Sequence, residues 1–283
     1  MNASSPLRYA VIGNPIEHSR SPRIHQLFAE QCGIALDYER VLAPLDGFAA
    51  VVQNFFAEGG RGMNVTVPFK EEAFQLARGG LSQRASMAAA VNTLWMEDGH
   101  LHGCNTDGVG LLADLRRLGH DPCQRSILLV GAGGAARGVV LPLLEAGCAR
   151  LHIVNRSVDR ARRLRDDVVN QLPDYAGVLT VGTLDQATGA WDIVVNATST
   201  GLSGEAPALP PALFAPDALA YDMVYGSLPT PFMVQSRETG ASQVADGLGM
   251  LVGQAAASFE IWHGVLPDTV PVLASLRAAL RDG

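Results

Sequence analysis

The sequence lacks the surplus of positive charge that binding to nucleic acids or anionic membranes requires. Its 283 residues include 21 Lys and Arg against 28 Asp and Glu, which gives a formal net charge of −7. Such a balance does not offset repulsion from a phosphate backbone. Basic residues cluster once, in RSVDRARRLR at 156–165. We therefore expect no nucleic acid and no membrane among the partners.

Long apolar runs, targeting segments and paired cysteines are also missing. No stretch approaches the roughly 18 apolar residues of a membrane span, and the N-terminus shows no signal-peptide pattern. The four cysteines have no CxxC or other ligand spacing and are expected to be reduced thiols (Cys32, Cys104, Cys123 and Cys148). The one close histidine pair, in HLH at 100–102, suits a hairpin surface better than a metal site. These absences predict a cytoplasmic protein without a metal.

The chain does have the apolar content of a sizeable folded core. Hydrophobic residues make up 48% of it, and the mean hydropathy is +0.15. Its length is enough for two ordinary domains or one large one. Because it contains no internal repeat and no low-complexity linker, the division into domains has to be read from the order of helices and strands.

The first hundred residues alternate between strand-like and helix-like segments, which predicts an α/β domain. In the segment SPRIHQLFAEQCG, Ser21 can cap a helix and Pro22 suits its first position. The Asp98–Gly99 pair predicts the turn of a hairpin. The expected strands are 8–13, 35–41 and 62–67, the expected helices are 21–33 and 48–60, and the hairpin is 91–103.

A second α/β region begins near residue 124. RSILLV at 125–130 is almost wholly apolar, as is typical of a strand buried in a parallel sheet. A glycine turn and a helix at 134–146 follow, and further strands at regular intervals predict a doubly wound sheet (150–154, 177–181, 192–197, 219–224 and 241–245). We predict a first domain at 1–107, a second at 108–245 that starts with a linking helix (108–119), and C-terminal helices within 246–283 that pack on the first domain.

The segment GAGGAARG at 131–138 has the pattern of a dinucleotide-binding loop. It supplies G-x-G-x-x-A directly after an apolar strand and opens a helix, which is the context this fingerprint requires. Gly131 permits a tight turn, and Gly133 lets the backbone approach a pyrophosphate at the positive end of the helix. The predicted cofactor contacts in the loop are Gly131, Ala132, Gly133, Gly134 and Ala135.

The residues after the next strand predict which dinucleotide is bound. NAD-binding versions of this fold usually carry an acidic residue there, which holds the ribose 2′-hydroxyl. This chain has Asn155, Arg156 and Ser157 instead, with Arg160 four positions beyond Arg156. A guanidinium gives a 2′-phosphate bidentate, charge-assisted hydrogen bonds, whereas a carboxylate would repel it. We therefore predict NADP(H) as the cofactor.

Lys70 follows a stiff stretch of chain, NVTVPFK at 64–70. The β-branched residues favour an extended backbone, and Pro68 fixes its own φ and restricts the residue before it. A cation placed directly beyond such a corner is held in one direction. The alternative is an ordinary surface lysine after a strand.

Several further motifs accompany NVTVPFK in a characteristic order. They are GNPIEHSRSP (13–22), AVNT (90–93), NTDG (105–108), GAGGA, NATSTG (196–201), YDMVY (221–225) and ADGLGMLVGQAA (245–256). Together they resemble the shikimate dehydrogenase family over essentially the whole chain. The resemblance implies a substrate domain, a Rossmann domain and NADPH-dependent reduction of 3-dehydroshikimate to shikimate, a step in aromatic amino-acid biosynthesis.

The resemblance also implies roles for individual residues. The substrate carboxylate would be held by Ser19 and Ser21, where Ser21 as a simple helix cap is the alternative. Ring hydroxyls would be contacted by Thr66, Asn92, Asp107, Tyr225 and Gln254. Met223 and Gly247 match positions beside the nicotinamide, and further cofactor contacts match Ala197, Thr198 and Ser199. Gln83 stands where the family usually has an acidic residue near the cofactor, which puts that one contact in doubt.

Lys70 and Asp107 match the catalytic pair of the family. Reduction of a ketone leaves charge on its oxygen, and a positioned lysine can neutralise it as a general acid and act as a base in the reverse direction. Asp107 would orient Lys70 or share a hydrogen bond with the reacting hydroxyl. Its alternative role is the N-cap of the linking helix.

Three other functions compete with this interpretation. A quinate/shikimate dehydrogenase shares the Lys–Asp pair but commonly prefers NAD, which Arg156 and Arg160 disfavour. A methylene-tetrahydrofolate dehydrogenase also has two domains and an active-site lysine, but a serine pair does not suit a pterin. A catalytically silent sensor of NADP(H) and a small acid would not need both Lys70 and Asp107. Nothing in the sequence indicates an obligatory protein partner.

Overall fold

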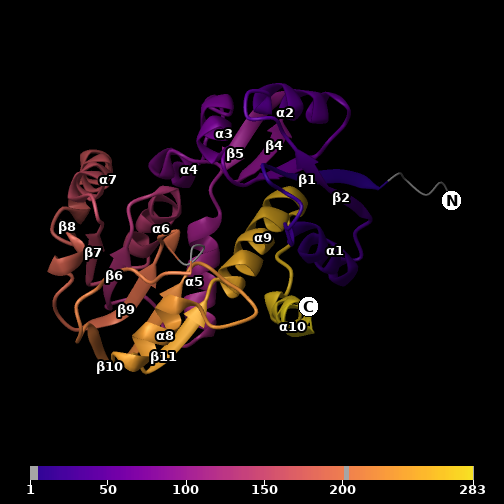
Figure 1. The fold of residues 1–283 in the computed structure, drawn as a ribbon. Helices are drawn as coiled ribbons and strands as arrows, with labels where there is room; N and C mark the ends of the chain where they lie inside the picture. Colours follow the sequence, from indigo (N-terminus) through magenta and orange to yellow (C-terminus); the bar gives the residue numbers. More distant parts are fainter. Residues whose placement is uncertain (1–5, 201–203, 283) are drawn as a thin grey trace. The chain divides into compact units, whose positions relative to one another are not determined.

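The computed structural model describes residues 6–200 and 204–282, and the chain divides into two compact units (Figure 1). The first unit consists of Met1–Thr106 together with Val252–Ala274, and the second of Asp107–Leu251 together with Ser275–Gly283. Among the described residues, no helix is both long enough and apolar enough to cross a membrane. Residues 275–283 group with the second unit, and the predicted domain boundaries stay a prediction.

The first unit is built on a five-stranded sheet with the strand order β2-β1-β3-β4-β5. The pairs β1–β2 and β1–β3 are parallel, and β3–β4 and β4–β5 are antiparallel. The strands are β1 (Leu7–Gly13), β2 (Leu36–Leu42), β3 (Gly62–Val65), β4 (Thr93–Glu97) and β5 (His100–Cys104). The helices are α1 (Ser21–Cys32), α2 (Phe48–Ala57), α3 (Lys70–Leu76) and α4 (Gln83–Ala88).

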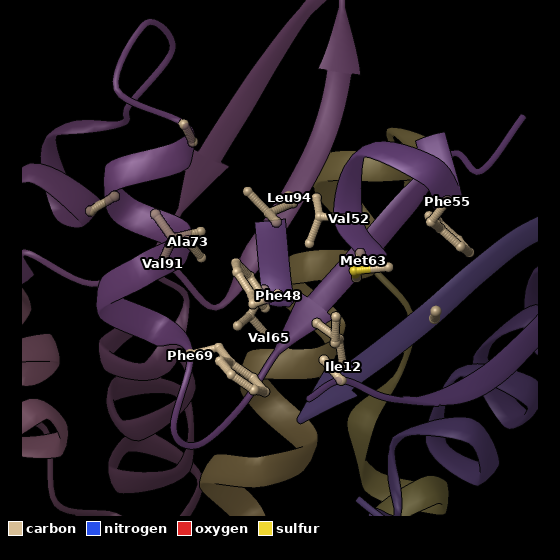
Figure 2. Close-up of a cluster of buried hydrophobic side chains, with 14 residues drawn as sticks. Ile12, Phe48, Val52, Phe55, Met63, Val65, Phe69, Ala73, Val91 and Leu94 are labelled. Carbon is tan, nitrogen blue, oxygen red and sulfur yellow. The ribbon is translucent and has the colours of Figure 1, made fainter. Parts of the chain in front are cut away.

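The core of the first unit forms between this sheet and the helices α2 and α3. Phe48 and Val52 come from α2 and are fully buried against Met63 and Val65 of β3. Figure 2 shows these side chains together with their neighbours Ile12, Phe55, Phe69, Ala73, Val91 and Leu94. Burial of so many apolar groups stabilises the unit, since each large side chain contributes roughly 1.5–3 kcal/mol. The corner at residues 66–69 is therefore attached to a rigid base.

The second unit is built on a six-stranded, wholly parallel sheet in the order β11-β10-β9-β6-β7-β8. In order of sequence this is the 3-2-1-4-5-6 arrangement of a doubly wound dinucleotide-binding fold, as predicted. The strands are β6 (Ser126–Val130), β7 (Arg150–Val154), β8 (Leu179–Gly182), β9 (Trp191–Asn196), β10 (Phe214–Asp222) and β11 (Gln243–Asp246). The helices are α5 (Asp107–Arg117), α6 (Gly134–Glu145), α7 (Val158–Gln171) and α8 (Pro231–Glu238), with short 3₁₀ turns at Pro173–Tyr175 and Leu184–Gln186.

Two C-terminal helices, α9 (Leu248–His263) and α10 (Thr269–Asp282), complete the chain. Most of α9 belongs to the first unit, where the Trp262 indole packs 4.9 Å from the Tyr9 ring and donates to Leu94 O over 3.2 Å. A Cβ on Gly62 would come within 2.5 Å of that indole, so β3 has to carry glycine at this position. The last turns of α10 belong to the second unit, where Arg277 forms an ion pair with Asp246.

Two local expectations were wrong. Ser21 does not cap α1: the N-cap residue is Arg20, there is no side-chain capping bond, and Ser21 is already the first helical residue. The Ser21 N–H is instead accepted by Ser19 Oγ over 3.3 Å. The third strand ends at Val65 rather than at residue 67, because the chain turns at Thr66, whose carbonyl accepts the N–H of Phe69 over 3.1 Å.

Candidate active site

The corner that precedes Lys70 is fixed by backbone hydrogen bonds to the neighbouring strand. Thr66 N–H donates to Ile12 O over 3.0 Å, and Val67 O accepts the N–H of Asn14 over 3.1 Å. The Asn14–Pro15 and Val67–Pro68 peptide bonds are both cis. Lys70 then opens α3 with a half-buried side chain, and its catalytic role stays a prediction.

The serine pair lies at the start of α1. Ser19 O accepts two hydrogen bonds from the Arg40 guanidinium, from Nε over 3.0 Å and from Nη2 over 2.7 Å. Ser21 is only 7% exposed, and the nearby Tyr38 hydroxyl donates to Asn64 Oδ1 over 2.7 Å. Burial raises the pKa of Tyr38 well above its usual value, which the Ser21 side chain partly opposes. The Ser19 backbone is thus held by Arg40 of β2, and Ser19 Oγ in turn accepts the Ser21 N–H.

The structure brings Asn92 and Gln254 together inside the first unit. Asn92 Nδ2 donates to Gln254 Oε1 over 3.3 Å, although the two residues are 162 positions apart. Asn92 Oδ1 accepts the backbone N–H of Thr106 over 2.9 Å. Because Thr106 directly precedes Asp107, this bond also fixes the chain immediately before the predicted catalytic carboxylate.

Asp107 is the first residue of α5 and is 7% exposed. A carboxylate in the first turn interacts favourably with the partial positive charge of a helix N-terminus. The next residue, Gly108, lies against α6: a Cβ there would come within 2.3 Å of Pro142 and 2.6 Å of the Gly138 carbonyl oxygen. The start of α5 is therefore fixed within the second unit by close contact between two helices.

The glycine loop lies between β6 and α6, as predicted. Gly131 has a φ of +114°, and its N–H donates to Val154 O over 2.8 Å. A Cβ on it would lie 3.1 Å from the carbonyl carbon and oxygen of Ala197, so a tight turn requires glycine here. A Cβ on Gly133 or Gly134 would meet nothing within 4 Å. Packing among the described residues does not require glycine at these two positions, which stay predicted contacts of a pyrophosphate.

Arg156 and Arg160 lie at the start of α7, directly after β7, and both are exposed. Their neighbours on the helix are engaged: Arg162 pairs with Asp159 over 3.0 Å and Arg165 with Asp166 over 3.1 Å. In the described part of the chain, neither Arg156 nor Arg160 has an ion pair. Asn155 Nδ2 donates to Ser157 O over 2.9 Å and orders the turn before the helix.

The two loops that carry the other predicted cofactor contacts are held together by Asp222, which sequence reasoning missed. Asp222 Oδ1 accepts Asn196 Nδ2 and the N–H of Val224, both over 3.1 Å, and Oδ2 accepts the Thr230 hydroxyl over 2.6 Å. Burial raises the pKa of Asp222, against the effect of these hydrogen bonds. Asn196 Oδ1 in turn accepts the N–H and hydroxyl of Thr198, over 3.1 and 2.7 Å.

The remaining predicted residues fall in both units. Met223 and Tyr225 follow β10 and are half-buried, and Gly247 N–H donates to Val224 O over 3.2 Å. Gly247 must be glycine, since a Cβ would lie 2.1 Å from the Met223 carbonyl oxygen. Gln83 is exposed at the start of α4 in the first unit. Gly201, the last residue of the NATSTG motif, lies outside the described residues, and in the described ranges no cluster of His, Cys, Asp and Glu could hold a metal ion.

The parallel sheet, the glycine loop at the carboxyl end of β6 and the basic start of α7 define a dinucleotide-dependent oxidoreductase. The chain belongs to the shikimate dehydrogenase family. Three family models match it: the shikimate dehydrogenase substrate binding domain at residues 11–94, shikimate/quinate 5-dehydrogenase at 116–203, and the shikimate 5′-dehydrogenase C-terminal domain at 247–277.

Individual relatives are similar over nearly their full length. The shikimate dehydrogenase (NADP(+)) of Bordetella petrii is 61% identical over 283 residues, which covers 99% of each chain. That of Bordetella avium is 64% identical over 275 residues, 96% of each chain. The crystal structure of shikimate 5-dehydrogenase from Thermus thermophilus in complex with NADP(H) and shikimate is 35% identical, with a TM-score of 0.85, and the match covers 97% of this chain and 100% of that one. NADP(H) is thus the cofactor, as predicted.

Proposed function

We propose that the protein catalyses the reversible, NADPH-dependent reduction of 3-dehydroshikimate to shikimate in chorismate biosynthesis. The observation that carries this proposal is that close relatives named for this activity match the chain from end to end. The ion pairs of Arg162 and Arg165 support the choice of NADP(H), since among the described residues no carboxylate pairs with Arg156 or Arg160.

Substrate recognition is assigned to polar side chains of the first unit and of the loops after β10. Ser19 and Ser21 bind the carboxylate. Asn92 and Gln254, which are hydrogen-bonded to each other, bind ring hydroxyls. Thr66, Asp107 and Tyr225 complete this set. The rigid corner at residues 66–69 supports the role of Thr66, because its backbone cannot move without breaking bonds to β1.

The chemical step needs a hydride and a proton. NADPH supplies the hydride, and Lys70 supplies the proton. As the ketone carbon accepts the hydride, its oxygen takes a proton from Lys70 Nζ, so that no full negative charge develops on the oxygen. Asp107 accepts a hydrogen bond from the reacting hydroxyl and orients the amine. In the direction of oxidation, Lys70 takes the proton back. Lys70 is therefore the general acid and base of the proposed reaction.

The test is an absorbance assay at the nicotinamide band with the purified protein, shikimate and NADP⁺. We expect rapid reduction of NADP⁺, and slower or no reduction when quinate replaces shikimate or NAD⁺ replaces NADP⁺. Equal rates with quinate and NAD⁺ would favour the broader quinate/shikimate dehydrogenase. A protein that binds both ligands without turnover would be the silent sensor.

A further inference from the structure

A continuous hydrogen-bonded path crosses the buried interior of the first unit. It begins at Tyr38, a buried residue of β2. Tyr38 Oη donates to Asn64 Oδ1 over 2.7 Å. Asn64 Nδ2 then donates to Ser258 Oγ over 3.0 Å. The path therefore joins β2 to α9, the helix that carries Gln254.

Ser258 connects this path to the strands. It is fully buried, and its Oγ lies 2.8 Å from Thr93 Oγ1 and 3.3 Å from Thr106 Oγ1. It also donates to the carbonyl oxygen of Gln254, one turn earlier on the same helix, over 3.0 Å. A serine in the middle of a helix usually does not stabilise the helix. The four polar contacts of the Ser258 hydroxyl therefore indicate a specific role.

The backbone N–H of Thr106, together with the hydroxyl groups around Ser258, determines which end of the Asn92 amide faces Gln254. Asn92 Oδ1 accepts from Thr93 Oγ1 over 2.9 Å, from Thr106 N over 2.9 Å and from Thr106 Oγ1 over 3.1 Å. Because Oδ1 accepts these hydrogen bonds, Nδ2 is the end of the amide that donates to Gln254 Oε1. The two ends of an asparagine amide have the same shape, so only such a network can select between them.

We propose that Asn64 and Ser258 are positioning residues for the substrate site: they hold the hydroxyl groups that orient Asn92 and Gln254. Both ends of the Asn64 amide are hydrogen-bonded. Its Oδ1 also lies 3.1 Å from His25 Nε2, and its Nδ2 donates to Asn92 O and to Ser258 Oγ. The inference rests on the proposed function for the roles of Asn92 and Gln254. Neither positioning residue touches the substrate or the cofactor in this assignment.

Ser258→Ala tests the proposal by steady-state kinetics. Loss of one hydrogen bond in a buried network corresponds to a threefold to tenfold effect. We expect KM for shikimate to rise by about that factor, with KM for NADP⁺ unchanged within twofold. Thr93→Val should give a similar shift. The double variant should be little worse than either single one, because Thr93 and Ser258 share one contact.

Ser236→Ala is the matched control, since Ser236 is also a buried helical serine but lies on α8 of the second unit. It should leave both KM values unchanged.

If Ser258→Ala unfolds at a far lower temperature than the wild type, Ser258→Cys is the second variant. Cysteine keeps the volume with a weaker donor, so KM for shikimate should rise by a smaller factor. An unchanged KM for shikimate in a folded Ser258 variant, or equal shifts in both KM values, would overturn the inference. An inactive wild type would overturn the proposed function instead.

Discussion

Lys70 is the only lysine in the sequence, so all the other cationic side chains among the 21 Lys and Arg are arginines. Arginine is always charged and cannot exchange a proton near neutral pH, whereas lysine can. In the proposed mechanism the arginines therefore have only electrostatic roles, and Lys70, at the end of the rigid corner, is the one basic side chain that transfers a proton.

Replacement of Lys70 by alanine should lower turnover by about 10²–10⁴-fold, the usual contribution of a general acid or base. NADPH binding, measured by fluorescence titration, should stay normal because the residue acts only on the reacting oxygen. Turnover close to that of the wild type would refute the catalytic assignment.

The single lysine also permits a test without mutation. Acylation removes the charge of Lys70 and otherwise modifies only the N-terminal amine among the aliphatic amines of the chain. The acylated protein should lose turnover and retain NADPH binding, and Lys70→Ala treated in the same way should show no further loss.

Replacement of Arg156 by alanine should weaken NADPH binding by ~1.5–3 kcal/mol, the contribution of a hydrogen bond to a charged group, and barely affect NADH. The matched control is Arg163→Ala, which removes another exposed guanidinium from the same helix. Paired titrations with the two cofactors measure the preference directly. An unchanged preference for NADPH over NADH in Arg156→Ala would refute the assignment of Arg156 to the 2′-phosphate.

Among elements, the β6–loop–α6 connection makes the most specific prediction, because its two glycines are required for different reasons. Gly133→Ala should weaken NADPH binding at least tenfold while the melting temperature stays within about 2 °C, since a Cβ there meets no protein atom within 4 Å but would crowd the predicted pyrophosphate site. Gly131→Ala should lower the melting temperature as well, because its positive φ and the nearby Ala197 carbonyl oppose a side chain.

The order of the elements could largely be predicted from the sequence, whereas their connections through buried polar groups could not. The apolar run of β6 and the turn at Asp98–Gly99 are local signals, and both elements form where they were expected. The short helix α3 carries no such signal, since it starts two residues after a proline. Asn64 and Ser258 interrupt apolar segments, and their partners are up to 194 positions away in the sequence. Only tertiary structure shows that these polar residues meet.

At the scale of the whole molecule, one buried histidine should set the response to acid. Burial of His25 lowers its pKa from 6.5 to about 3, despite the hydrogen bond to Asn64. The unfolded chain therefore binds a proton at this residue below pH 6.5 while the folded chain does not. The free energy of unfolding should fall by about 1.4 kcal/mol per pH unit as the pH drops from about 6.5 towards 3.

Urea unfolding between pH 4 and pH 7 measures this slope. In His25→Gln the slope should be smaller by about one proton, although the variant is less stable overall because His25 stacks on the Tyr38 ring at 4.4 Å. His100→Gln, in the exposed hairpin turn, is the control and should keep the wild-type slope. A slope that is identical in all three proteins would exclude His25 as the source.

The assignment of residues 252–274 to the first unit has a consequence for biosynthesis. Translation proceeds from the N-terminus, so residues 1–106 and the strands of the parallel sheet are synthesised before Ser258 and Trp262. Until then the amide of Asn64 has no helical hydroxyl to bind and Gly62 faces no indole. The first unit therefore cannot complete its polar network until α9 has been synthesised, and the second unit in turn waits for α10, which supplies Arg277 to Asp246.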